Sequence, residues 1–311
     1  MEEIYDIIIL GGGPAGMSAG IYASQTKQKT LLIENSKFGG QIATTSMVTN
    51  YLGFEKITGK DLSDTMHNHL LSLNSVEILV AEICNTQLDG DIKEVITSKG
   101  TYKSHSVIIA IGTQSRKLGV DNESKYLRHG LTYNTLMDRD KFENKIVAVI
   151  GGGNTAIEDA IYISEKAQKV YLIHRRNEFR ADMGLVEELN NKINSEHKIE
   201  LVLECKPKEI IGKEDIEKLV LTHIPDDQDI VLDVQGIFVC IGRGASTDII
   251  DEKVARDSNG YIITNDRMET NLPGVYATGD IRTTPLRQIV TAVSDGAIAS
   301  TQALTYNRKF K

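Results

Sequence analysis

The stretch YDIIILGGGPAGMSAGIYASQ, residues 5–25, decides the fold, because an apolar run leads through a glycine-rich turn into a helix of small residues. A second apolar run, residues 30–33, follows and ends in Glu34. A strand, a GxGxxG turn, a helix and a second strand in this order are typical of a dinucleotide-binding βαβ unit. The stretch therefore predicts an α/β fold of the Rossmann type.

The same pattern occurs a second time further along the chain. Residues 146–150, IVAVI, lead into the turn GGGNTA at residues 151–156, which is followed by a predicted helix and an apolar run at residues 170–173. A lone glycine fingerprint is weak evidence, but both copies follow a β-branched strand and precede a helix, as the fold requires. The sequence therefore predicts two nucleotide-binding units.

Each small residue of the two turns has its own physical role. The first glycine permits the sharp exit from the strand, the second lets the backbone approach a pyrophosphate, and the third small residue lets the helix pack near the strand. The start of the helix then offers free N–H groups and a positive dipole to phosphates. The candidate cofactor-binding residues are Gly11, Gly13, Pro14, Ala15 and Gly16 in the first turn, and Gly151, Gly153, Asn154, Thr155 and Ala156 in the second.

The end of the second strand in each unit predicts which nucleotide binds. Glu34 would hydrogen-bond ribose hydroxyls and repel a 2′-phosphate, so the first unit is expected to take FAD or NAD. The corresponding place in the second unit holds basic side chains, which pair well with a phosphate and predict NADPH rather than NADH. A solvated basic edge is the alternative. These candidate residues are His174, Arg175, Arg176 and Arg180.

Composition and charge exclude several other classes of protein. The 311 residues are 41% hydrophobic and 25% charged, as in a soluble globular protein. The formal net charge of −8 argues against nucleic acid or an anionic membrane as the partner. No apolar run is long enough to span a bilayer, and the acidic start leads straight into a strand, unlike a signal peptide. A cytoplasmic protein is expected.

The cysteines and histidines predict neither a disulfide framework nor a metal site. Cys84, Cys205 and Cys240 are odd in number with no close pair, and each is expected to be a small buried hydrophobic residue in a strand. His67 and His69 lie two apart in a predicted helix, so their side chains would point to different faces.

Several segments together resemble the low-molecular-weight thioredoxin reductase family over essentially the whole chain. The resemblance implies an FAD domain of residues 1–113 and 246–311, an NADPH domain of residues 114–245 inserted into it, and a homodimer. The predicted fold is α/β, with two Rossmann-like domains of the three-layer ββα type. The segments that carry the resemblance are residues 11–16, 39–41, 50–54, 110–113, 151–158, 174–180, 277–280 and 285–290.

The resemblance also extends the expected FAD site beyond the first turn. Asp280 follows an apolar run and precedes a predicted helix at residues 286–304. Its carboxylate is suited to accept from flavin ribityl hydroxyls, or alternatively to cap a helix. The further FAD residues that the resemblance implies are Gly40, Gln41, Asn50, Ala110, Gly112, Gly279, Asp280, Arg287, Gln288 and Ile289.

One feature of the family is missing. Its members carry a redox-active Cys-x-x-Cys between a tyrosine and an aspartate, shortly before the second glycine turn. Here Tyr133 and Asp138 enclose Asn134 and Met137 at the two cysteine positions, and neither side chain can form a disulfide. No catalytic residue is therefore assigned. Asp138 has lost its partner thiol, and a helix-capping or surface role is expected for it.

The missing pair redirects the expected path of the electrons. NADPH is expected to reduce FAD, which then passes electrons to ferredoxin or flavodoxin, a free flavin, a quinone or oxygen. One alternative is a thioredoxin or disulfide reductase that acts without the usual pair, and another is a nucleotide-binding redox regulator that turns over slowly. Thioredoxin-reductase-like ferredoxin–NADP reductases also lack the pair. They usually carry a C-terminal extension over the flavin, whereas about a dozen residues follow Ala299 here.

Overall fold

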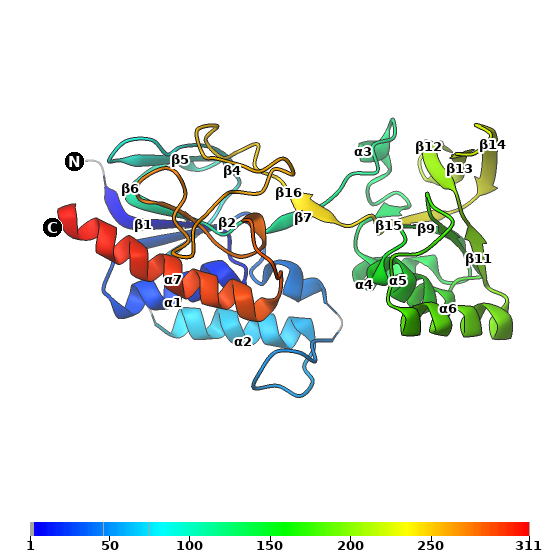
Figure 1. Ribbon diagram of the computed structural model, residues 1–311, viewed down its shortest axis with the longest axis horizontal. Coiled ribbons are helices and arrows are strands. Elements are labelled where there is room, and N and C mark those ends of the chain that lie inside the picture. The colour runs from blue at the N-terminus through cyan, green and yellow to red at the C-terminus, as the bar shows by residue number, and fades with distance from the viewer. Residues whose placement is uncertain (1–2, 46, 74, 311) are drawn as a thin grey trace. The chain divides into compact units, whose positions relative to one another are not determined.

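The computed structural model describes residues 3–45, 47–73 and 75–310, with their side chains except those of Leu136 and Met137. The chain divides into two compact units, of which the first is Met1–Gln114 with Gly244–Lys311 and the second is Ser115–Arg243 (Figure 1). Strands β7 (Thr113–Ser115) and β16 (Arg243–Ala245), which carry the two chain connections, pair with each other. None of the helices in the described ranges is long and apolar enough to cross a membrane.

The first unit is built on a seven-stranded sheet of order β3-β2-β1-β6-β5-β4, with β17 beside β6. Strands β1, β2, β3, β6 and β17 pair in parallel, whereas β4 and β5 are antiparallel. The strands are β1 (Ile4–Leu10), β2 (Thr30–Glu34), β3 (Val76–Val80), β4 (Ile83–Gln87), β5 (Lys93–Thr97), β6 (Gly100–Ile109) and β17 (Val275–Ala277). The helices are α1 (Pro14–Gln25), α2 (Gly59–Ser72) and α7 (Ile289–Asn307), with short 3-10 turns η1 (Gly40–Thr44), η3 (Gly279–Ile281) and η4 (Arg308–Phe310).

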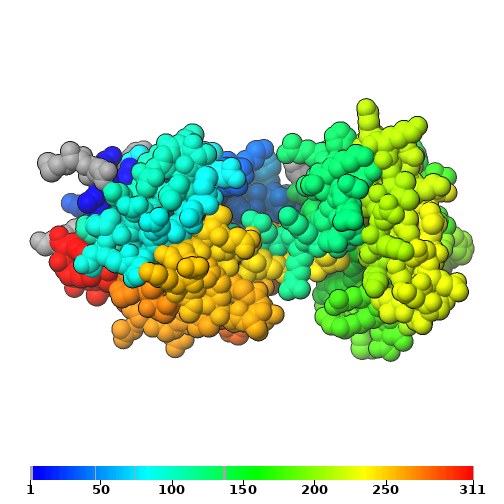
Figure 2. Space-filling view, turned by 90° about the horizontal axis from the view of Figure 1, so that it is seen from above, coloured from blue at the N-terminus to red at the C-terminus, as the bar shows by residue number. Residues whose placement is uncertain are grey.

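The two sequence segments of the first unit lie side by side, cyan against orange in Figure 2. The backbone N–H of Leu88 donates to Asp251 at 2.7 Å, and β17 pairs with β6. Small residues let α1 and α7 cross closely, because a Cβ on Gly296 would lie 2.1 Å from the carbonyl oxygen of Ala15. The last third of the chain therefore completes the core that the first third begins.

The second unit contains a five-stranded parallel sheet of order β11-β10-β9-β15-β8 and an antiparallel sheet of order β12-β13-β14. A parallel sheet in each unit confirms the predicted α/β fold. The strands are β8 (Leu131–Thr132), β9 (Ile146–Ile150), β10 (Lys169–Ile173), β11 (Ile199–Val202), β12 (Cys205–Gly212), β13 (Ile216–His223), β14 (Asp229–Asp233) and β15 (Gly236–Val239). The helices are α3 (Glu123–Tyr126), α4 (Thr135–Asp138), α5 (Asn154–Ser164) and α6 (Met183–Glu196), with the 3-10 turn η2 (Arg139–Phe142).

The prediction that all three cysteines are buried in strands is wrong for two of them. Cys84 is exposed, because it lies on β4 at the end of the sheet order, where alternate side chains face solvent. Cys240 is partly buried and follows β15 rather than lying within it. Cys205, the first residue of β12, is buried as predicted. In α2, His67 stacks on Phe38 and His69 is exposed.

Candidate functional site

The first glycine turn is shaped by contacts that only glycine tolerates. Gly11 has a φ of +106°, and a Cβ there would lie 2.5 Å from the carbonyl oxygen of Ala110. A Cβ on Gly16 would lie 1.8 Å from the carbonyl oxygen of Gly11, so α1 presses directly on the end of β1. These two glycines have the structural roles that the spacing predicts.

Gly13 differs from its neighbours, because the space beside it is open. Within the described ranges, the nearest atom to a Cβ on Gly13 would be the Cα of Gly40, at 3.9 Å. Gly13 is also the N-cap of α1, and no side chain of the described residues caps this helix. Pro14, the first helical residue, has no N–H to leave unpaired. The open space and uncapped helix start fit a pyrophosphate, whose oxygens accept from backbone N–H groups.

Glu34 is held against the same turn. One carboxylate oxygen accepts from the backbone N–H of Gly12 at 2.6 Å, and the other accepts from that of Ser36 at 3.0 Å. The carboxylate at the end of β2 therefore lies beside the glycine turn, where a ribose of a bound nucleotide is expected in this fold.

Gln41 and Asp280 join two distant segments beside α1. Gln41 Nε2 donates to Asp280 Oδ2 at 3.0 Å and to Thr113 Oγ1 at 3.1 Å. Gly279 has a φ of +70°, and a Cβ there would lie 3.1 Å from that of Ala15. The turn that carries Asp280 therefore packs closely on the start of α1.

The start of α7 gathers further predicted residues. Asn50 Nδ2 donates to Gln288 Oε1 at 3.2 Å, and Gln288 forms a capping box with Thr291. The guanidinium of Arg287 lies over the ring of Tyr261 at 4.0 Å, and its Nε donates to the carbonyl oxygen of Asp280 at 3.3 Å. Three further predicted FAD residues have the following places. Gly40 is the first residue of η1, Gly112 has a φ of +63°, and Ile289 is the first residue of α7.

A buried ion pair supports the Asp280 turn and was missed from the sequence. Asp295 Oδ2 accepts from the backbone N–H of Gly279 at 3.0 Å and from Arg282 at 3.2 Å, with both side chains buried. Burial raises the pKa of Asp295, against the opposing effect of Arg282. A lone acid inside the apolar run of α7 is the signal that could have identified it, since a buried carboxylate needs a partner.

The second glycine turn repeats the geometry of the first. A Cβ on Gly151 would lie 2.3 Å from the carbonyl oxygen of Cys240, whereas one on Gly153 would meet no described atom within 4 Å. Gly153 is the N-cap of α5, and the described residues supply no side-chain cap there either. This turn therefore also fits a pyrophosphate at a helix start, contributed by Asn154, Thr155 and Ala156.

His174 lies beneath this turn and is buried rather than solvated. A Cβ on Gly152 would lie 2.3 Å from its ring, which stacks on Phe179. Among the described residues no partner exists for its buried Nε2. Burial lowers the pKa of His174, and Arg176, Arg175 and Arg180 lower it further. A neutral imidazole with an unsatisfied nitrogen fits a bound polar group.

The three predicted arginines lie on the loop that follows β10, and all three are exposed. The backbone N–H of Arg180 donates to the carbonyl oxygen of Gly152 at 2.8 Å, so the loop returns to the glycine turn. Exposed guanidinium groups beside a helix start are suited to a phosphate. The structure thus brings the residues of the predicted NADPH site together.

The segment in which the resemblance predicts the redox pair includes the single turn α4. Asn134 donates its backbone N–H to Thr132 Oγ1 at 3.0 Å, and the side chain of Met137 lies outside the described part of the structure. Asp138 accepts from Lys141 at 2.6 Å and from Thr132 at 2.5 Å. Burial alone would raise the pKa of Asp138, but these two hydrogen bonds lower it, so the carboxyl is ionised at neutral pH.

The thiol of Cys240 is linked to α4 through Asp159. Asp159 Oδ2 accepts from Thr135 Oγ1 at 2.7 Å and from Cys240 Sγ at 3.1 Å. Burial raises the pKa of Cys240 well above its ordinary value, and the Asp159 carboxyl adds to this effect. Cys240 therefore stays a thiol and is a poor nucleophile.

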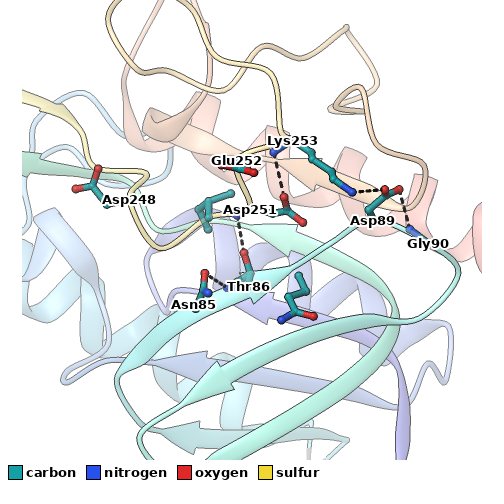
Figure 3. A pocket seen from close by; sticks show the side chains of 10 residues that line it. Asn85, Thr86, Asp89, Gly90, Asp248, Asp251, Glu252 and Lys253 are labelled. Atoms are coloured by element: carbon teal, nitrogen blue, oxygen red, sulfur yellow. Dashed lines mark hydrogen bonds and ion pairs between the residues drawn. The ribbon is translucent and has the colours of Figure 1, made fainter.

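The first unit also contains a pocket between β4 and the segment of residues 248–253 (Figure 3). Asp251 accepts from the backbone N–H groups of Leu88 and Lys253, and Lys253 pairs with Asp89 at 2.8 Å. These carboxylates hold one segment to the other, which is a structural role.

The chain resembles known proteins along almost its full length. The pyridine nucleotide-disulphide oxidoreductase family matches residues 5–296. A thioredoxin reductase of Peptoclostridium acidaminophilum is 39% identical over 316 residues, covering 98% of each chain. The solved thioredoxin reductase of Lactococcus lactis (FR conformation) has a TM-score of 0.87 at 36% identity, covering 98% of this chain and 99% of that one. A ferredoxin-flavin thioredoxin reductase of Clostridium acetobutylicum has a TM-score of 0.54 at 29% identity, covering 100% and 99%.

Proposed function

Because this chain belongs to the pyridine nucleotide-disulphide oxidoreductase family, we propose that it moves electrons from NADPH to FAD and from FAD to an acceptor. In this proposal the electrons do not pass through a dithiol of the protein. The family and its thioredoxin reductase relatives confirm the predicted enzyme class, an NADPH-dependent flavoprotein oxidoreductase, and the predicted cofactors, FAD and NADPH. The acceptor, the binding residues and the assembly are the parts that we propose.

FAD is assigned to the first unit and NADPH to the second. The charges at the ends of β2 and β10 support this assignment. The carboxylate of Glu34 suits a ribose without a 2′-phosphate, and the arginine loop after β10 suits a 2′-phosphate. Gln41, Asp280, Arg287 and the start of α7 would hold the flavin end of FAD. When bound, FAD supplies the hydride acceptor and the electron store. The protein side chains bind and orient the two nucleotides.

The observation that carries the proposed electron path is the absence of any Cys-x-x-Cys in the sequence. Asn134 and Met137 occupy the positions of the family's redox pair, and Asp138, at its proton-transfer position, is ionised and paired with Lys141. Cys205 is buried and the pKa of the Cys240 thiol is raised, so neither is suited to replace the pair. Cys84 is exposed but is a single free thiol, and one thiol cannot form an internal disulfide. Electrons would therefore leave FAD directly.

Ferredoxin is the favoured partner among the candidates. The support for this choice is a structural relative named a ferredoxin-flavin thioredoxin reductase, a name that associates ferredoxin, as well as thioredoxin, with this fold. Flavodoxin, a free flavin, a quinone and oxygen are the other acceptors. A homodimer is proposed as the assembly, on the family resemblance alone.

Anaerobic addition of NADPH followed by an acceptor screen tests this proposal. We expect NADPH to bleach the flavin absorbance rapidly. The absorbance should return when ferredoxin or another of the candidate acceptors is added, but not when thioredoxin is added. A flavin that stays oxidised with NADPH bound would favour a slow nucleotide-binding regulator. Thioredoxin turnover that disappears when Cys84, Cys205 and Cys240 are all replaced by serine would overturn the proposed path.

A further inference from the structure

The loop that carries the three arginines is tied to the second glycine turn by a pair of side chains. Asn154 Nδ2 donates to Asp182 Oδ2 at 2.6 Å, and the backbone N–H of Asp182 donates to Asn154 Oδ1 at 3.0 Å. We call this reciprocal pair the Asn154–Asp182 clasp. It joins the first residue of α5 to the residue that precedes α6.

The side chain of Asp182 forms the clasp and does not cap its own helix, α6. It is the N-cap of α6, where an aspartate usually accepts from the backbone of its own helix. Within the described residues its side chain makes no such capping bond and reaches instead to a residue 28 positions away. The carboxylate of Asp182 therefore ties the loop to the second glycine turn instead of capping α6.

Among the residues that the structure describes, two ties join the segment of residues 180–182 to the glycine turn, and the clasp is one of them. The backbone N–H of Arg180 donates to the carbonyl oxygen of Gly152 at 2.8 Å, and Asp182 follows two residues later. Residues 180–182 therefore run alongside residues 152–154, with one tie at each end. Arg176 is anchored elsewhere, since its carbonyl oxygen accepts from the backbone N–H of Glu204 at 3.3 Å.

We propose that the clasp positions Arg180 for the 2′-phosphate of NADPH and so contributes to the preference for NADPH over NADH. The inference rests on the proposed function, which assigns NADPH to this turn. Asp182 acts here as a positioning residue, because it reaches the 2′-phosphate only through Arg180. Asn154 contributes its side chain to the clasp and its backbone to the helix start proposed for the pyrophosphate. Both side chains are exposed, so the clasp can be removed without opening the core.

The sign of the effect separates the clasp from simple electrostatics. A carboxylate near a phosphate repels it, so if Asp182 acted through its charge alone, its removal would tighten binding. If Asp182 acts through the clasp, Asp182→Ala weakens binding because Arg180 loses one of its two ties. Asp182→Asn keeps an oxygen that accepts from Asn154, and we expect it to bind more like the unaltered protein.

Calorimetric titration of the FAD-loaded protein tests the inference with two probes, adenosine 2′,5′-bisphosphate and adenosine 5′-monophosphate. We expect Asp182→Ala to weaken the bisphosphate about fivefold, as for the loss of one net hydrogen bond, and to leave the monophosphate unchanged. Glu187→Ala, which removes an exposed acid of α6, is the matched control and should change neither. Thermal unfolding checks that each variant is folded.

A double-mutant cycle locates the effect. Asp182→Ala should add nothing to Arg180→Ala, but should keep its full effect in an Arg175→Ala background. If the arginine variants weaken bisphosphate binding while Asp182→Ala leaves it unchanged or tightens it, the clasp inference is wrong and the NADPH assignment stands. If none of the Arg175, Arg176 and Arg180 variants affects the bisphosphate, the proposed NADPH site itself is wrong.

Discussion

Gln41 and Asp280 lie 239 positions apart in the sequence and are joined by a hydrogen bond of 3.0 Å. Their segments come from opposite ends of the chain and meet beside the start of α1. A substitution at either position therefore tests whether the two segments form one flavin site.

Asp280→Ala should lower the affinity for FAD about tenfold or more, because a hydrogen bond to an ionised group is among the stronger ones. The measurement is the dissociation constant of FAD, from flavin fluorescence quenching after removal of the cofactor. Glu82→Ala removes an exposed acid elsewhere in the first unit and is the control. Equal FAD affinity in Asp280→Ala and the control would contradict the assignment of Asp280.

Arg175→Ala and Arg176→Ala should each raise the KM for NADPH by about tenfold, since a guanidinium–phosphate pair is a charge-assisted interaction. The KM for NADH should stay the same, because NADH has no 2′-phosphate. Steady-state kinetics with both nucleotides and a fixed acceptor give the two values. A parallel rise in both KM values would mean that the arginines stabilise the loop rather than read the phosphate.

Installing a cysteine pair at the two positions where the resemblance predicts one should change the acceptor. The double variant Asn134→Cys with Met137→Cys supplies two thiols at the family's spacing, and we expect it to gain NADPH-dependent reduction of thioredoxin. Each single variant should stay inactive in this assay, because one thiol cannot form the internal disulfide. If the unaltered protein already reduces thioredoxin at the rate of the double variant, the two positions do not determine the acceptor.

The three thiols should differ strongly in their rate of alkylation. Cys84 is exposed and should react first, whereas Cys205 is buried and the pKa of Cys240 is raised by burial and by Asp159. Because thiolate is the reactive form, Cys240 should stay unreactive as the pH rises to about 9, above the ordinary cysteine value. Mass spectrometry after a short iodoacetamide pulse counts the labels. Cys84→Ser should remove the fast label, and fast labelling that persists in this variant would contradict the low reactivity expected of Cys205 and Cys240.

Asp295→Ala should destabilise the fold by about 3–5 kcal/mol, because it leaves the Arg282 guanidinium buried without its partner. Chemical unfolding of the cofactor-free protein gives this free energy independently of FAD binding. Arg282→Met with Asp295→Leu removes both charges and should recover most of the loss. A double variant as unstable as Asp295→Ala would mean that the apolar replacements do not pack in this space.

Local and long-range features of the site were unequally predictable. The two glycine turns could be predicted because the spacing of their small residues between a strand and a helix is a local pattern of the βαβ unit. The carbonyl oxygens that Gly11 and Gly151 lie against, those of Ala110 and Cys240, come from distant segments and were not predicted. The Gln41–Asp280 bond and the Asn154–Asp182 clasp could not, because no spacing rule says which distant side chains meet. The error at Cys84 has a related cause, since the sequence of a strand does not reveal which of its two faces another layer covers.

The pairing of β7 with β16 bears on how the chain could be cut and rejoined. The backbone N–H of Arg116 donates to the carbonyl oxygen of Gly242 at 3.0 Å, so the segment between them starts and finishes at adjacent points. If the segment were removed, a short reverse turn could join the two ends of the remaining chain, because a short loop costs little entropy to close. The enclosed module could then be exchanged for one from another relative. Since we propose that this module binds NADPH, we expect the specificity for the nicotinamide donor to be transferred with it.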